Sequence, residues 1–222
     1  MSATSPVVVF DFDLTLTRWD TADRFFRWLL ERQTWRLVMV LGLAPLLAPL
    51  FLFRSSRKLP VRYAVWVATF GLSQERLQQL VRDHADELFS GPARVFLQEG
   101  LERIQFHLEQ GHRVVIATGC LEVLARELLG RAGYGHVPLV GSTLKPCLGG
   151  MARHEHCFGP NKIPMLSSRG FAPPWAFTYT DHQCDLPVLK LSAERFLINP
   201  KPEAVRLIQS ELACELTILT WR

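Results

Sequence analysis

The chain has 222 residues, 48% of them hydrophobic, and a formal net charge of +4. This length is enough for one sizeable domain plus an insertion, with a core that needs no disulfide or structural metal. The basic excess is small and no nucleic-acid-binding motif accompanies it, so nucleic acid is not expected as a partner. Five irregularly spaced cysteines and a short polar start predict a reducing compartment and no secretory signal.

A short buried strand is predicted at Val7–Phe10, because three valines and a phenylalanine follow one another without a polar residue. Asp11 and Asp13 come directly after it, and alternation along an extended backbone points both to the same side. Two neighbouring carboxylates repel each other unless a cation or a proton lies between them. A functional site is therefore favoured over a plain polar strand end.

Residues 18–91 have a helical pattern rather than an alternating one. Thr21 is predicted to cap a helix that begins with Asp23, and Ser73 is predicted to cap a later amphipathic helix. Between them, residues 37–53 contain no charge over 17 positions, and residues 63–70 are again apolar. Basic residues flank the long apolar run: Arg27, Arg32 and Arg36 before it, and Arg54, Arg57, Lys58 and Arg62 after it.

A regular alternation of helices and strands begins after Pro92. Helices are predicted over residues 95–109, 121–129, 162–166 and 200–212, and strands over residues 113–117, 137–140, 176–180 and 195–198. Gly149 and Gly150 separate two short segments and predict a β-hairpin over residues 143–157. The alternation predicts an α/β fold, a three-layer sandwich with a parallel sheet. Residues 1–17 and 92–222 would form its core, and residues 18–91 would be an inserted helical cap.

Further chemistry-bearing residues follow the later strands. Thr118 and Gly119 end one strand, where a hydroxyl and backbone N–H groups can hold phosphate oxygens. Lys162 opens a helix and brings a mobile positive charge to the same edge. Asp181 and Asp185 follow another strand and add two acids that suit a hard cation.

This ordered set resembles the haloacid dehalogenase-like phosphohydrolases over essentially the whole chain. Asp11, Asp13 and Thr15 match the first motif of that superfamily, Thr118 the second, Lys162 the third, and Asp181 with Asp185 the fourth. The resemblance implies a Rossmann-like core with a helical cap inserted after the first motif. Leu14 departs from the pattern, because many members have Gly there, and we expect altered packing with intact chemistry.

The resemblance also implies a catalytic mechanism. The charges of the predicted site residues are consistent with this mechanism. Four aspartates against one lysine repel a phosphate dianion unless a cation such as Mg²⁺ is bound. Asp11 would attack phosphorus to form an aspartyl-phosphate, and Asp13 would act as general acid and then general base. Thr15, Thr118, Gly119 and Lys162 would bind the phosphate. The expected metal ligands are Asp11, Asp13 (through its main-chain carbonyl), Asp181 and Asp185.

Within the superfamily, four stretches are similar to membrane-associated lipid phosphatases that act on phosphatidylglycerophosphate: FRWLLERQ, TFGLSQERLQQL, CFGPNK and YTDHQCDLPVL. This similarity implies a phosphorylated lipid substrate and a place on the cytoplasmic face of the inner membrane. One alternative is a soluble cytoplasmic phosphatase for a metabolite of the phosphoserine or histidinol phosphate type. Another is a non-catalytic membrane-binding module. The oligomeric state is not predicted.

The apolar run over residues 37–53 is not expected to cross a membrane once. The first motif precedes it and the other three follow, yet all four must meet at one site on one side of the bilayer. Pro45 and Pro49 are expected to kink or break a helix here. We therefore expect a re-entrant or interfacial helix pair on the anionic inner leaflet. The alternative is packing inside the cap or at a dimer interface.

Overall fold

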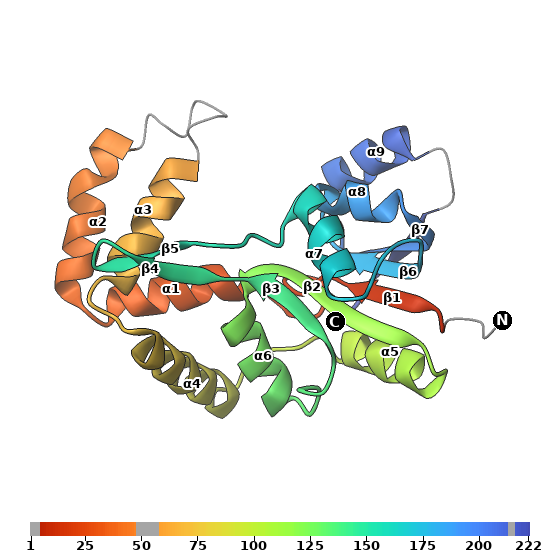
Figure 1. The fold of residues 1–222 in the computed structure, drawn as a ribbon, viewed down its shortest axis with the longest axis horizontal. Coiled ribbons are helices and arrows are strands. Elements are labelled where there is room, and N and C mark those ends of the chain that lie inside the picture. The colour runs from red at the N-terminus through yellow and green to blue at the C-terminus, as the bar shows by residue number, and fades with distance from the viewer. Residues whose placement is uncertain (1–4, 48–57, 213–215) are drawn as a thin grey trace.

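In the computed structural model, residues 5–47, 58–212 and 216–222 are described (Figure 1). Their main sheet has six strands in the order β3-β2-β1-β6-β7-β8, and every neighbouring pair is parallel. The strands are β1 (Val7–Phe10), β2 (Arg113–Leu121), β3 (Leu139–Ser142), β6 (Trp175–Thr180), β7 (Ser192–Ile198) and β8 (Thr217–Leu219). The first strand of the chain thus lies in the middle of the sheet, between β2 and β6.

Helices cover both faces of this sheet, as the alternation of β1 requires. Val8 and Phe10 pack in the cluster that includes α5 (Gln98–Glu109) and α6 (Glu122–Arg131). Val9 points the other way, into a cluster with α7 (Lys162–Ser168) and α8 (Leu186–Leu189). A further helix, α9 (Pro202–Glu211), packs beyond α8. The predicted α/β fold, a Rossmann-like three-layer sandwich, is confirmed.

Within the described residues, the cap region before this alternation has four helices: α1 (Thr21–Glu31), α2 (Thr34–Leu47), α3 (Lys58–Thr69) and α4 (Gln74–Ser90). Figure 1 shows α2 and α3 extending away from the sheet, whereas α4 lies beside α6. Arg36, one of the basic residues that flank the apolar run, is buried and donates to the carbonyl oxygen of Phe70 at 2.8 Å. Its guanidinium therefore joins the start of α2 to the end of α3.

The predicted β-hairpin is confirmed as β4 (Leu144–Cys147) and β5 (Gly150–Arg153), and it packs on the cap helix α3. Trp66 donates from Nε1 to the carbonyl oxygen of Cys147 at 2.9 Å, and the Met151 N–H donates to Thr69 Oγ1 at 2.9 Å. A Cβ on Gly150 would lie 2.7 Å from the Trp66 carbonyl oxygen, so glycine permits this close approach. The hairpin lies within the 92–222 range predicted for the core, yet it contacts the cap. The division into domains stays a prediction.

Several predicted boundaries are wrong for tertiary reasons. The helix predicted from residue 95 begins at Gln98, because Phe96 pairs with Thr17 in a β-bridge before the helix starts. Asp20, not Thr21, caps α1 by accepting the Asp23 N–H. The strand β8 was not predicted, since its three residues follow no clear alternating pattern.

Residues 37–47 of the apolar run belong to α2, which continues through Pro45, so the expected break at this residue does not occur. Pro49 and the basic residues Arg54 and Arg57 lie outside the described residues. Within the described parts of the chain, no helix combines the length and the apolar character needed to cross a membrane.

His84 of α4 makes the stability of the cap depend on pH. It is buried among Phe25 and Trp28, neither ring nitrogen has a hydrogen-bond partner among the described residues, and burial lowers its pKa to about 4. The folded state therefore binds this proton less readily than the unfolded state. Its contribution to stability is present above pH 6.5 and is lost as the pH falls toward 4.

We expect H84L to reduce the acid-induced loss in the free energy of unfolding between pH 7 and 4.5 by about 1 to 3 kcal/mol. Urea denaturation at several pH values measures this loss. The control H154L changes an exposed histidine and should leave the pH dependence as it is. Equal slopes for H84L and the unmodified chain would contradict this explanation.

Candidate active site

The loop after β1 positions the first two aspartates at the carboxyl end of the sheet. The Asp11 N–H donates to the Tyr179 carbonyl oxygen of β6 at 2.8 Å, which holds Asp11 beside the end of the neighbouring strand. The chain then turns, because the N–H groups of Leu16 and Thr17 both donate to the Phe12 carbonyl oxygen. Leu14 has a φ of 59° in this turn, in the left-handed region that favours glycine. This explains why Gly suits the position, and Leu14 is the residue that departs from the family pattern.

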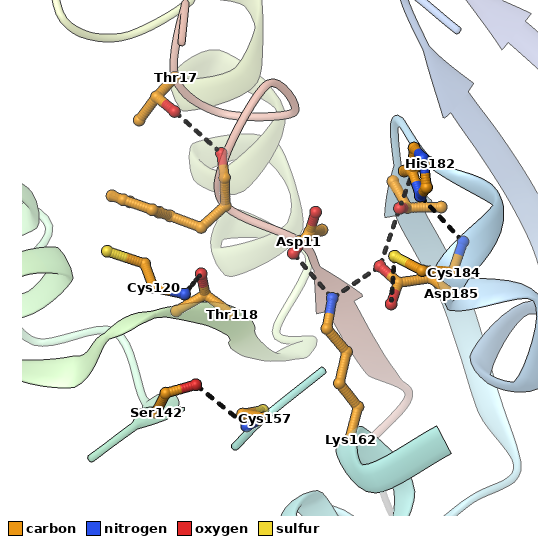
Figure 2. A network of polar contacts seen from close by, with 12 residues as sticks. Asp11, Thr17, Thr118, Cys120, Ser142, Cys157, Lys162, His182, Cys184 and Asp185 are labelled. Carbon is orange, nitrogen blue, oxygen red and sulfur yellow. Dashed lines mark hydrogen bonds and ion pairs between the residues drawn. The ribbon is translucent and has the colours of Figure 1, made fainter. Parts of the chain in front are cut away.

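Lys162 joins two of the predicted aspartates (Figure 2). Its Nζ lies 2.7 Å from Asp11 Oδ1 and 2.6 Å from Asp185 Oδ2, and its side chain is almost completely buried. A short 3₁₀ turn, Gly159–Asn161, directs the chain so that Lys162 begins α7 at the edge of the sheet. Thr180 also donates to Asp185 Oδ2, at 2.9 Å. The sequence analysis did not identify Thr180, although it is the last residue of β6 and directly precedes Asp181.

The charges in this cluster are strongly coupled. Burial and, next, the negative charge of Asp11 raise the pKa of Asp181 to about 8. Burial also raises the pKa of Asp11 to about 6, although the ammonium of Lys162 acts in the opposite direction. For Lys162, burial disfavours the charged form, but Asp11 and Asp185 outweigh burial and raise its pKa. The single positive charge of Lys162 thus does not balance the negative charge of the carboxylates around it.

Asp13 lies on the cap side of the cluster, where Thr21 at the start of α1 holds it. Thr21 donates to Asp13 Oδ1 twice, from its N–H at 2.8 Å and from its hydroxyl at 2.6 Å. Burial and then the negative charge of Asp20 raise the pKa of Asp13 to about 7, while the two hydrogen bonds act to lower it. Thr21 is a positioning residue that sequence reasoning took for a helix cap.

Thr118 and Gly119 lie in β2, which continues to Leu121 instead of ending at residue 117. The pairing of β2 with β3 shifts register between Ala117 and Leu121, so these residues occupy an irregular part of the strand. The Cys120 N–H donates to Thr118 Oγ1 at 3.0 Å, which leaves the hydroxyl hydrogen available to an incoming oxygen (Figure 2). Cys120 Sγ in turn lies 3.1 Å from the hydroxyl of Thr21.

Thr15 was predicted to bind phosphate, and His182 directly follows Asp181 in the sequence. Thr15 is fully buried, and its hydroxyl has no hydrogen-bond partner among the described residues. A phosphate contact by Thr15 therefore stays a prediction. His182 is exposed and accepts the Cys184 N–H at its Nδ1, so it stabilises the turn before α8.

The chemistry of the carboxylates fits a hard divalent cation. Among the described residues, no three His, Cys, Asp or Glu side chains are grouped closely enough to form a metal cage by themselves. Lys162 instead contacts two of the four predicted ligands. The aspartates of this cluster outnumber its one lysine, and a bound cation would offset the excess of negative charge. Side-chain oxygens of Asp11, Asp181 and Asp185, with the Asp13 carbonyl, would hold Mg²⁺, and this ligand set stays a prediction.

Two cavities approach this edge of the sheet. One, of about 480 Å³, is lined by Leu14, Asp181 and His182 together with residues near the start of α9. The other, of about 400 Å³, is bounded by Gly119 and Leu121 of β2, by α1 and α3, and by the hairpin. The first cavity thus reaches Asp181 beside α9, and the second reaches Gly119 beneath the cap.

The sequence model of the haloacid dehalogenase-like hydrolase family matches residues 8–190, which include all the residues of the site. The chain belongs to this family. The predicted hydrolase is thereby confirmed at the level of the family.

Solved structures show the same fold at low sequence identity. A Bordetella pertussis Tohama I protein of unknown function superposes with a TM-score of 0.71 at 15% identity, covering 97% of this chain and 99% of that one. A phospho-aspartyl intermediate analogue of phosphoserine phosphatase has a TM-score of 0.59 at 15% identity, with 97% and 93% covered. Cytosolic 5′-nucleotidase IIIB bound to cytidine has a TM-score of 0.62 at 11% identity, with 97% and 80% covered.

Removing the ammonium of Lys162 should leave Asp11 and Asp185 as uncompensated buried carboxylates. We expect K162M to lower the free energy of unfolding by about 3 kcal/mol at pH 8. The loss should be smaller at pH 5, because Asp11, whose pKa is already raised, then takes up a proton in the folded state.

Urea denaturation at the two pH values measures this effect. The control K190M removes a lysine from the exposed pair with Glu211 and should cost less than about 1 kcal/mol at either pH. A loss for K162M that does not depend on pH would contradict the electrostatic explanation.

Proposed function

We propose that the chain is a Mg²⁺-dependent phosphomonoesterase that works through an aspartyl-phosphate. The observation that supports this most directly is the contact of one buried lysine with both Asp11 and Asp185 at the carboxyl edge of the sheet. Thr118 and the backbone of the β2 irregularity lie on the neighbouring strand. A nucleophile, a fixed positive charge and hydrogen-bond donors thus surround one place where a phosphoryl group can react.

Each residue of the site has a defined part in this reaction. A carboxylate oxygen of Asp11 forms a bond to phosphorus as the bond between phosphorus and the alcohol oxygen breaks. Asp13, held by Thr21, gives a proton to that alcohol oxygen and later takes one from the water that hydrolyses the aspartyl-phosphate. Lys162 and Thr118 stabilise charge on the phosphoryl oxygens. Bound Mg²⁺ would reduce the repulsion between the phosphate and the aspartates.

The substrate that we propose is phosphatidylglycerophosphate, which would be converted to phosphatidylglycerol at the cytoplasmic face of the inner membrane. The apolar surface at the far end of the cap supports a lipid substrate. Val38 and Leu41 of α2 are 61% and 59% exposed, and Leu148 at the tip of the hairpin is 89% exposed. Val38 and Leu41 thus give α2 an exposed apolar surface, and Leu148 adds another on the hairpin that packs on α3; such surface is typical of a membrane or protein contact.

A soluble phosphomonoester of the phosphoserine type is the second candidate, and residence in the cytoplasm would accompany it. The fold similarity to phosphoserine phosphatase favours it, since the same arrangement of core and cap serves that enzyme. A non-catalytic membrane-binding module is the third reading. It does not explain why all the aspartates and Lys162 are present at one edge of the sheet.

Phosphate release from three substrates tests these candidates. We expect activity on phosphatidylglycerophosphate in mixed micelles to exceed that on phosphatidic acid and phosphoserine, and to disappear with a chelator. D11N should lower turnover by more than about 10³-fold, because it removes the nucleophile. D83N, on α4, is the matched control. Normal turnover by D11N excludes the mechanism, and preference for phosphoserine excludes the lipid substrate.

Membrane association has its own test. Sedimentation with anionic liposomes should pull down the unmodified chain, and the double variant V38E/L41E should remain in the supernatant. Both positions are exposed, so the charges should not disturb the core. The control L207E places the same charge at an exposed leucine of α9, away from the cap, and should sediment normally. Equal sedimentation of all three proteins would contradict a membrane role for α2.

A further inference from the structure

The cavity of about 400 Å³ beneath the cap is lined by both apolar and charged residues, among them Arg62 and Arg153. Phe26 and Leu30 of α1, Val65 of α3 and Leu144 of the hairpin are among its apolar lining residues. At one end it reaches Gly119, the neighbour of Thr118. The alcohol part of a phosphomonoester that is held beside Thr118 has room to extend into this cavity.

Arg62 and Arg153 line the cavity from different elements. Arg62 is on α3, and Arg153 is the last residue of β5, the strand that packs on α3. Among the described residues, neither guanidinium forms an ion pair with a carboxylate. Burial and then the positive charge of Arg62 lower the pKa of Arg153, so the two guanidinium groups are near enough to repel each other.

The acids of the same cavity already have partners of their own. Asp23 forms an ion pair with Arg27 at 2.9 Å, and Asp20 accepts the N–H of Asp23 as the cap of α1. Of the three arginines in the lining, only Arg62 and Arg153 are thus left to attract an anion from outside the chain. Two guanidinium groups offer the forked donors that match phosphate oxygens.

We propose that Arg62 and Arg153 bind a second phosphate of the substrate, a phosphodiester in the alcohol part that leaves after hydrolysis. This assignment rests on the proposed function, because phosphatidylglycerophosphate has both a terminal phosphomonoester and a phosphodiester one glycerol unit away. The apolar walls then accommodate glycerol and the first acyl carbons. A carboxylate on a small amino acid would leave these walls without a partner.

Measuring kcat/KM with two substrates distinguishes binding of a second phosphate from a general effect of the substitutions on the protein. R62Q and R153Q should each lower kcat/KM for phosphatidylglycerophosphate by about 10- to 100-fold, as expected when a charge-assisted hydrogen bond is lost. Phosphatidic acid has no second phosphate, so its kcat/KM should change by less than about twofold. The matched control K145Q removes an exposed cation from the same hairpin and should leave both values unchanged. Equal losses on both substrates, or a loss on phosphoserine alone, would overturn the proposal.

A binding experiment keeps the proposal testable if the proposed function fails. Short-chain dihexanoyl-phosphatidylglycerol retains the phosphodiester but lacks the terminal phosphomonoester that the enzyme would hydrolyse. Isothermal titration calorimetry should show that it binds the unmodified chain and K145Q equally, and R62Q and R153Q at least about tenfold more weakly. Inactivity on phosphatidylglycerophosphate with this pattern intact would refute only the reaction. Equal Kd values in all four proteins, or no binding to the unmodified chain, would refute the arginine site.

Discussion

The compensation of buried negative charge by one lysine is the interaction on which the site depends. Asp11 and Asp185 belong to segments far apart in the chain, and a buried carboxylate without a partner is costly. Lys162 contacts both of them, but Asp181 and Asp13 are near enough to keep the cluster short of positive charge. The fold thus maintains a place that is favourable for a cation, and this property follows from the order of the strands, since β1 lies between β2 and β6.

The parts of the fold that follow from local patterns were predictable. Val7–Phe10 alternates between two hydrophobic clusters, and residues directly after parallel strands meet at one edge, so Asp11, Thr118 and Asp181 were found from strand ends alone. Lys162 was found because it opens a helix after a glycine-containing turn. The β2 irregularity at Thr118 was not predictable, because it arises from pairing with β3 and not from the strand itself.

Contacts between distant segments were equally hidden from the sequence. Thr21 looked like a helix cap, since threonine often has that role, but Asp20 caps α1 and releases Thr21 to hold Asp13. Asp13 lies in the part of the chain predicted as core, and Thr21 lies in the part predicted as cap. The proposed general acid is therefore oriented by the first helix of the cap. Sequence patterns are read for each helix separately, so they do not show that Thr21 of one segment positions Asp13 of another.

The hairpin packs on α3 of the cap, and the chain connects it to β3 and α7 of the core. The strand β4 directly follows β3 in the chain. Between β5 and Lys162, the Cys157 N–H donates to Ser142 Oγ (Figure 2). Because Ser142 belongs to β3, this hydrogen bond fastens the segment between the hairpin and Lys162 to the main sheet. The position of Lys162 beside Asp11 is thereby supported from the sheet, although the hairpin itself packs on the cap.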